Sequence, residues 1–280
     1  MPLDVLLVVL LGALLHALWN ALVRAASDKL HGTLRVVWGS GLLTLVSLPF
    51  LPLPAPASWP YLAASVLIHV AYFSLLAFSY RAAELSLAYP VMRGTAPAIT
   101  ALAAALLLQE MPSAGGWAGI VLICGGVLLL ALGHGAPARA ALRPALGNAL
   151  VIAAYTLVDG QGARLSGHAF SYTGWIFLAT AVLMLGLTFA LRGPTEMRQM
   201  LPGWRIGLLG LLGGGCTLAS YALALWAMIR APIATVAALR ETSIVFAALI
   251  GLLFLKERLR PQRLASVLLV CAGASSIKLF

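Results

Sequence analysis

Two arginines, Arg93 and Arg240, stand within long apolar segments, and each is followed at the same interval by a glutamate, Glu110 or Glu257. An ionisable group costs about 2.5 kcal/mol or more at the centre of a membrane, so it usually faces the protein interior or water. A guanidinium there can hold the carboxylate of a bound solute or pair with an acid of the protein. Arg93 also lies near a segment end, so its side chain can alternatively reach the membrane surface.

The first apolar segment carries polar side chains on one helical face. His16, Trp19 and Asn20 follow the i, i+3, i+4 spacing that places residues on one side of a helix. An imidazole, an indole and an amide together can form a wall for an amino acid or a similar solute. The alternative is that His16 and Asn20 hydrogen-bond to neighbouring helices and only pack the bundle.

Two acids, Asp159 and Glu241, lie farthest from any segment end. Each can couple transport to protons or can neutralise one of the two arginines. We expect the ion-pair role, because a buried arginine needs a counter-charge. Glu241 directly follows Arg240, and adjacent helical residues point about 100° apart, so these two do not form an ordinary ion pair.

Aromatic side chains that lie at helical spacing from these residues are further candidates for substrate binding. Tyr155 stands four residues before Asp159, and Tyr89 shares a stripe with Arg93 and Pro97. Pro97 removes a backbone hydrogen bond, so we expect its helix to bend or open there. The predicted substrate-binding residues are His16, Trp19, Asn20, Tyr72, Ser79, Tyr80, Tyr89, Arg93, Tyr155, Asp159, Arg240 and Glu241. No catalytic, cofactor-binding or metal-binding residue is predicted.

The composition places these residues in a membrane. Hydrophobic residues make up 62% of the chain and charged residues 9%, whereas a soluble domain is about one quarter charged. Apolar runs of about 20 residues, each able to cross about 30 Å of hydrocarbon, follow one another with short connections. They lack the alternation of barrel strands. The predicted membrane helices are 3–25, 34–52, 60–81, 86–108, 115–133, 143–164, 170–191, 205–229, 232–254 and 261–279.

The second half of the chain repeats the first. Superposing Arg93 on Arg240 also superposes Glu110 on Glu257, Cys124 on Cys271 and Gly126 on Gly273, without a gap. Each copy holds five spans, an odd number, so the copies insert with opposite orientation. The predicted fold is an all-α membrane protein with ten transmembrane helices as two inverted five-helix repeats. The repeats are predicted at 1–134 and 143–280, joined by a basic cytoplasmic connection at 135–142.

Basic residues set the predicted orientation. The net charge is +10, and most lysines and arginines flank the odd-numbered connections between spans. Because such residues stay on the cytoplasmic side, both termini are predicted outside the bacterial inner membrane. This topology signal explains the charge without a nucleic-acid partner.

Three stretches of sequence carry a family resemblance: HALWNALVRAASD in the first span, AYPVMRGTAPAITALAAALLLQE in the fourth, and KERL after the ninth. With the duplicated five-span unit, they resemble the EamA-type ten-helix exporters of the drug/metabolite transporter superfamily. The resemblance implies export of small metabolites such as amino acids by alternating access. It also implies a central cavity lined by spans 1, 3, 4, 6, 8 and 9. The aromatic amino acid exporters are the members that the chain most resembles.

Other functions stay open to different degrees. Within transport, the alternative is a flippase or exporter of lipid-linked sugar or drug-like amphiphiles. An intramembrane enzyme is disfavoured because the sequence has no HExxH motif and no paired intramembrane aspartates. Glu110 is expected to cap a helix or fix a loop. The expected partners are a small amino acid-like solute and the lipid bilayer, with the chain a monomer or a weak homodimer. Small-residue faces in the fifth and tenth spans, which include Gly119 and Gly273, suit tight helix packing either between the two halves or in a dimer.

Overall fold

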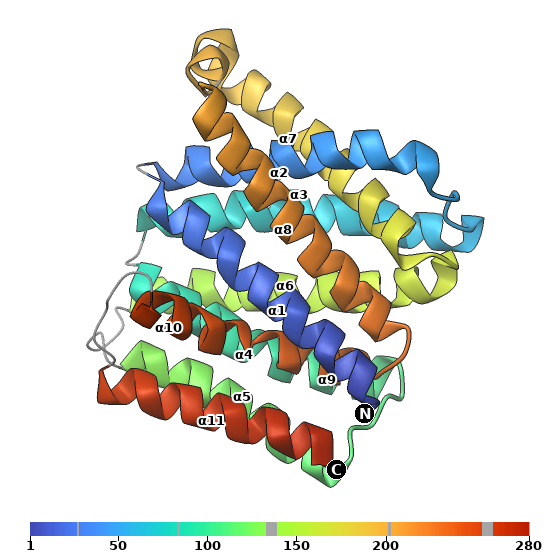
Figure 1. Ribbon diagram of the computed structural model, residues 1–280, viewed down its shortest axis with the longest axis vertical. Helices are drawn as coiled ribbons and strands as arrows, with labels where there is room; N and C mark the ends of the chain where they lie inside the picture. The colour runs from blue at the N-terminus through green and yellow to red at the C-terminus, as the bar shows by residue number, and fades with distance from the viewer. Residues whose placement is uncertain (27, 83–84, 133–138, 201–202, 254–259, 280) are drawn as a thin grey trace.

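The protein is a bundle of α-helices, with no β-strand among the residues that the structure describes (Figure 1). The computed structural model describes residues 1–280 except 27, 83–84, 133–138, 201–202, 254–259 and 280, and it leaves side chains undescribed at 73–74, 76–82, 85–89, 131–132, 139–142 and 196–200. The α-helices are α1 (Leu3–Ala25), α2 (Lys29–Ser47), α3 (Trp59–Ala82), α4 (Leu85–Leu107), α5 (Ala114–Leu132), α6 (Arg139–Ser166), α7 (Ala169–Met200), α8 (Trp204–Met228), α9 (Ile233–Arg240), α10 (Ser243–Leu253) and α11 (Pro261–Leu279). Two short 3-10 helices, η1 (Leu48–Phe50) and η2 (Pro56–Ser58), join α2 to α3.

The helices match the predicted membrane spans. Six described segments are long and apolar enough to cross a bilayer: Leu3–Ala25, Lys29–Phe50, Pro90–Leu107, Ala169–Thr195, Trp204–Met228 and Ile233–Leu253. The last of these contains α9 and α10, which together occupy the ninth predicted span. With α3, α5, α6 and α11, the described helices make up the ten that the sequence predicts, and the all-α membrane fold is confirmed.

Local sequence sets the helix ends that differ most from prediction. α2 begins at Lys29 rather than at residue 34, because the Asp28 carboxylate accepts the His31 backbone N–H at 3.0 Å and caps the first turn. α7 runs beyond the predicted span, but Gly193 interrupts it with φ 75° and ψ 174°, immediately before Pro194. Only glycine adopts that backbone conformation without strain.

Helices from the first half pack directly on helices from the second. α1 and α2 contact α8, α3 and α4 contact α6, and α5 lies along α11 (Figure 1). Ser220 of α8 donates a hydrogen bond to the backbone carbonyl of Gly12 in α1, at 2.7 Å. Both chain termini lie at the same end of the bundle (Figure 1), as an even number of spans requires.

The glycine-rich faces of α5 and α11 pair with each other inside the chain. A Cβ atom added to Gly119 would lie 2.6 Å from the Gly273 carbonyl oxygen, and one added to Gly273 would lie 2.6 Å from the Gly119 carbonyl oxygen. These helices therefore approach backbone to backbone, which is the close packing that small residues permit in membranes. Of the two roles expected for these faces, the structure uses them to join the halves.

The interrupted membrane helix lies in the second half of the chain. α4 continues through Pro90 and Pro97, whereas its counterpart is divided into α9 and α10 at Glu241 and Thr242. At the division the Glu241 and Thr242 N–H groups bond carbonyls three residues back, each at 3.0 Å. The Thr242 hydroxyl donates to one of those carbonyls at 2.7 Å. These hydrogen bonds replace the regular helical ones, so the helix can be interrupted within a membrane without leaving these backbone groups unpaired.

Candidate substrate-binding site

A cavity of about 100 Å³ lies between the two halves of the bundle. Its walls come from α1, α2, α3, α4, α6, α7, α8 and α9. The polar and aromatic lining residues are His16, Trp19, Asn20, Thr33, Ser40, His69, Tyr72, Arg93, Tyr155, Phe177, Thr180, Thr217, Ser220, Tyr221 and Arg240.

The structure brings most of the predicted binding residues together. Seven of the twelve line this cavity: His16, Trp19, Asn20, Tyr72, Arg93, Tyr155 and Arg240. Asp159 and Glu241 lie behind the wall, each bonded to a lining residue. The side chains of Ser79, Tyr80 and Tyr89 lie outside the described part of the structure. That these residues bind a substrate stays a prediction.

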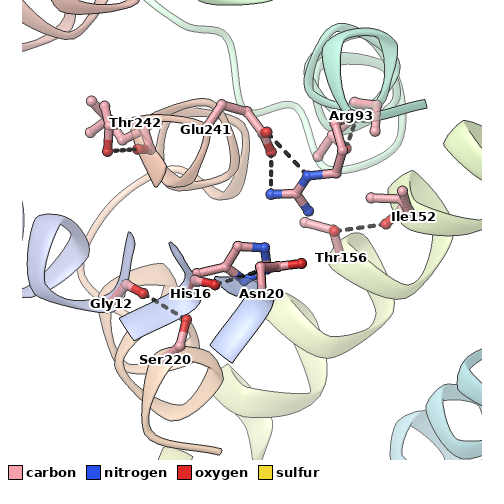
Figure 2. A network of polar contacts seen from close by, with 12 residues as sticks. Gly12, His16, Asn20, Arg93, Ile152, Thr156, Ser220, Glu241 and Thr242 are labelled. Atoms are coloured by element: carbon pink, nitrogen blue, oxygen red, sulfur yellow. Dashed lines mark hydrogen bonds and ion pairs between the residues drawn. The ribbon is translucent and has the colours of Figure 1, made fainter. Parts of the chain in front are cut away.

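The α1 wall is held by hydrogen bonds within its own helix. The Trp19 indole donates to His16 Nδ1 at 3.3 Å. The Asn20 amide donates to the His16 carbonyl at 2.8 Å (Figure 2). Within the described residues, neither His16 nor Asn20 bonds a neighbouring helix. All three side chains are half-buried at the cavity, which is the arrangement of a site wall rather than of an inter-helix tether.

Arg93 and Glu241 form a buried ion pair that joins α4 to the division between α9 and α10 (Figure 2). Arg93 Nε lies 3.1 Å from Glu241 Oε2, and Nη2 lies 2.8 Å from Oε1. The two side chains are only 7% and 5% exposed. This two-point contact is the strong geometry for an arginine and a carboxylate. It confirms the expected counter-charge role for Glu241 and leaves little positive charge of Arg93 uncompensated. For Asp159 the expected ion-pair role is wrong: within the described residues its carboxylate pairs with no cation, because the Tyr221 hydroxyl of α8 lies against it and donates the hydrogen bond.

Arg240 presents a guanidinium that is not paired with an acid. It is 9% exposed and lines the cavity at the last residue of α9. Its Cζ lies 5.1 Å from the centre of the Tyr221 ring, a cation–π contact. In the described part of the chain, Arg240 has no hydrogen bond or ion pair. The cavity therefore contains a buried cation that a bound anion can neutralise.

Aromatic rings form the wall beside Arg240. His69 lies 4.6 Å from Tyr155 and 5.8 Å from Tyr221, and Tyr221 also lies 5.7 Å from Phe177 (centroid distances). Tyr72 meets Tyr155 edge-to-face at 5.7 Å. These distances are typical of attractive aromatic pairs. His69, Phe177 and Tyr221 were not among the predicted binding residues. The i, i+3 spacing of His69 and Tyr72 is the signal that could have identified His69.

A polar network closes the bundle at the end where the termini lie. Glu110 follows α4 and pairs with Arg164 of α6. Its carboxylate also accepts a hydrogen bond, at 2.9 Å, from the backbone N–H of Ile233, which is the first residue of α9. Arg164 donates to the carbonyls of Met228 at 2.9 Å and Ala231 at 3.3 Å. Glu110 thus caps a helix of the opposite half, in line with the predicted capping role.

Comparison with known sequences decides the family. The sequence model of the EamA-like transporter family matches the chain twice, at residues 4–132 and 144–278. The chain belongs to the EamA-like transporter family. The predicted membership of the drug/metabolite transporter superfamily is confirmed, and this EamA-like protein is a multi-pass membrane transporter of small solutes. A comparison with curated proteins finds no match.

A solved crystal structure has the same fold. It superposes with a TM-score of 0.78 at 18% sequence identity, covering 100% of this chain and 98% of the other. At this identity the likeness shows the fold alone. One expectation from the family resemblance needs correction, because α2 and α7 also line the cavity, through Thr33, Ser40, Phe177 and Thr180. α2 packs on α8 through glycines, which bring its polar face close to the centre of the bundle.

Proposed function

We propose that this EamA-like transporter exports small metabolites that carry a carboxylate, amino acids first among them. The observation that supports this is the state of the two arginines in the cavity wall. Arg93 is neutralised by Glu241, whereas Arg240 has only the Tyr221 ring as a described partner. Arg240 is therefore the residue that we assign to the solute carboxylate.

The charge of the cavity supports an anionic group on the solute. Its described lining includes two arginines and two histidines but no aspartate or glutamate. A buried guanidinium that contacts no carboxylate is unfavourable, and a carboxylate that reaches it forms a strong charge-assisted hydrogen bond. The same lining gives an ammonium-only solute no acidic partner. A cationic drug is therefore a poor fit.

The aromatic wall supports an apolar or aromatic body. Tyr72, Tyr155, Phe177 and Tyr221 surround the space next to Arg240. Rings of this kind stabilise a flat apolar group by edge-to-face and stacked contacts. On the opposite side, Asn20 and the other polar groups of α1 can bond the remaining polar atoms. An amino acid with a hydrophobic side chain combines these features.

Alternating access is the mechanism that we infer from the architecture. The lining residues reach Val23 and Thr33, next to the α1–α2 connection, while Glu110 and Arg164 join the helices at the other end. With the orientation that the basic residues predict, the cavity extends toward the cytoplasm. Inverted repeats can exchange shapes and so present the cavity to the opposite side.

The test is counterflow of radiolabelled amino acids into liposomes that contain the purified protein. We expect saturable exchange that Arg240→Gln weakens by about ten- to a hundredfold, because a buried hydrogen bond to a charged group contributes about 1.5–3 kcal/mol. Arg230→Gln is the matched control, because Arg230 is exposed and lies over Trp226 outside the cavity lining. Exchange that persists unchanged in Arg240→Gln contradicts the assignment. No exchange of any amino acid favours a lipid-linked sugar or an amphiphile instead.

A further inference from the structure

We propose that Asp159 binds a proton when a solute carboxylate binds at Arg240, so that the solute and the proton occupy the carrier together. The inference rests on the proposed function, because it uses Arg240 as the carboxylate site. It adds a coupling ion and a residue that holds it.

Asp159 is a deeply buried acid without a cationic partner. Its residue is 0% exposed in α6, and its carboxylate accepts a hydrogen bond from the Tyr221 hydroxyl. No arginine, lysine or histidine lies within ion-pair distance of it among the described residues. Glu241 and Glu110, by contrast, each pair with an arginine. Asp159 is therefore the buried carboxylate whose charge depends most on what enters the cavity.

Tyr221 connects this acid to the proposed carboxylate site. Its hydroxyl donates to Asp159, and its ring faces the Arg240 guanidinium at 5.1 Å. One aromatic side chain thus contacts both the acid and the cation. Asp159 and Arg240 are close enough to affect each other's charge, although they do not touch.

The other groups that interact electrostatically with Asp159 come from its own helix and from four others. They are Ser65 and His69 of α3, Tyr155 of α6 itself, Tyr172 of α7, Tyr221 of α8 and Arg240 of α9. Four of these six are hydroxyl groups. His69 already bonds the Ser65 carbonyl with Nδ1, at 3.0 Å. Arg240 is the one permanently charged cation among these six groups, and a protonated His69 also offsets a negative Asp159.

Binding of a solute removes that offset. Before a solute binds, an ionised Asp159 has the positive charge of Arg240 nearby, while Arg93 and Glu241 neutralise each other. A solute carboxylate on Arg240 adds a second negative charge beside one cation. Transfer of a proton from water to an Asp159 carboxylate oxygen restores the balance, and no other bond is made or broken. Because linkage is reciprocal, a protonated Asp159 also strengthens carboxylate binding.

The sign of the pH dependence follows from this linkage. Acidification favours protonated Asp159, so affinity for the carboxylate rises as pH falls. One linked proton changes the dissociation constant by at most about tenfold per pH unit. The solute and the proton therefore move in the same direction, so a solute that is exported down its own concentration gradient carries a proton outward with it.

The experiment is titration calorimetry of the purified protein with L-phenylalanine in phosphate and in Tris, whose ionisation heats differ. The wild type is expected to take up close to one proton per bound solute and to bind more tightly as pH falls. Asp159→Asn should bind L-phenylalanine without proton uptake and with a dissociation constant that no longer follows pH. Asp4→Asn, an exposed acid at the start of α1, is the matched control and should behave as the wild type does.

Different outcomes test the inference and the proposed function on which it rests. Binding by the wild type without proton uptake overturns the inference but leaves the carboxylate site in place. Should Asp159→Asn fail to fold, Tyr221→Phe keeps the carboxylate and removes its donor. That variant should still take up a proton, over a shifted pH range, and an unchanged range contradicts the connection through Tyr221. If no amino acid binds to the wild type at all, the proposed function fails and the inference fails with it.

Discussion

Arg93 Nη2 lies 2.8 Å from Glu241 Oε1, so a cation of the first repeat is neutralised by an acid of the second. Glu241 directly follows Arg240, the counterpart of Arg93, and the first repeat has Gly94 in the corresponding place. A Cβ atom on Gly94 would lie 2.8 Å from Leu128 Cγ. A glutamate therefore does not fit there without repacking, and at this position of the repeat only the second copy supplies an acid, which pairs with Arg93.

The first prediction concerns the stability of this pair. Arg93→Gln leaves Glu241 as a buried carboxylate without its partner, which costs about 3–5 kcal/mol. Glu241→Gln should be similarly destabilising. The double substitution should cost clearly less than the sum of the two single ones, because it removes both charges. Thermal unfolding in detergent measures the three differences, and additive losses contradict a direct pair.

A second prediction uses the cap of α2, where pH has a defined effect. The His31 backbone N–H holds the pKa of Asp28 below its usual value. A lowered folded pKa stabilises the fold above the ordinary aspartate pKa, about 3.9, and this gain disappears as pH falls through the folded value. Asp28→Ala should therefore lower stability near neutral pH by about 0.5–1 kcal/mol, and the difference should vanish in acid. Unfolding midpoints from pH 7 to 3 test this, and Asp28→Asn should keep the cap at every pH.

Sequence periodicity predicted the helices well, because a membrane span is defined by its own apolar length. It also grouped His16, Trp19 and Asn20 correctly, since one helical face can be read from spacing alone. It excluded Arg240 as an ordinary partner of Glu241, but it could not tell whether Arg93 pairs with Glu241 or with Asp159. That choice depends on which helices face each other, which is a tertiary property.

The same limit explains the missed lining residues and the misplaced break. Phe177 in an apolar run looks the same whether it faces lipid, the core or a cavity. The helix was expected to bend or open at Pro97. α4 continues through that residue, and the interruption falls in the other copy, where the Thr242 hydroxyl bonds a backbone carbonyl. Proline removes one hydrogen bond, whereas a helix division needs partners for several groups.

A third prediction tests the contact between α5 and α11. Gly119→Ala places a methyl group 2.6 Å from the Gly273 carbonyl oxygen, so the helices must separate. Overpacking of this kind costs about 1–3 kcal/mol. Gly125→Ala is the matched control on α5, because nothing lies within 4 Å of its Cβ position. Equal unfolding midpoints for the two variants contradict a backbone-to-backbone contact between the repeats.

The last prediction concerns the carboxylate of Glu110, at the end of the bundle where the termini lie. This group holds Arg164 and the Ile233 N–H together, and Arg164 in turn holds the Ala231 carbonyl. Glu110→Gln removes the charge from both contacts. Loss of one charged hydrogen bond, about 1.5 kcal/mol, shifts the equilibrium between the closed and open forms of this end about tenfold toward the open form. The measurement is the labelling rate of a single cysteine placed at Ala231, which is 8% exposed, by a membrane-impermeant maleimide. The native cysteines are replaced beforehand, and Glu110→Asp serves as the variant that keeps the charge. Labelling about tenfold faster in Glu110→Gln supports closure by this network, whereas an unchanged rate shows that other contacts hold this end shut.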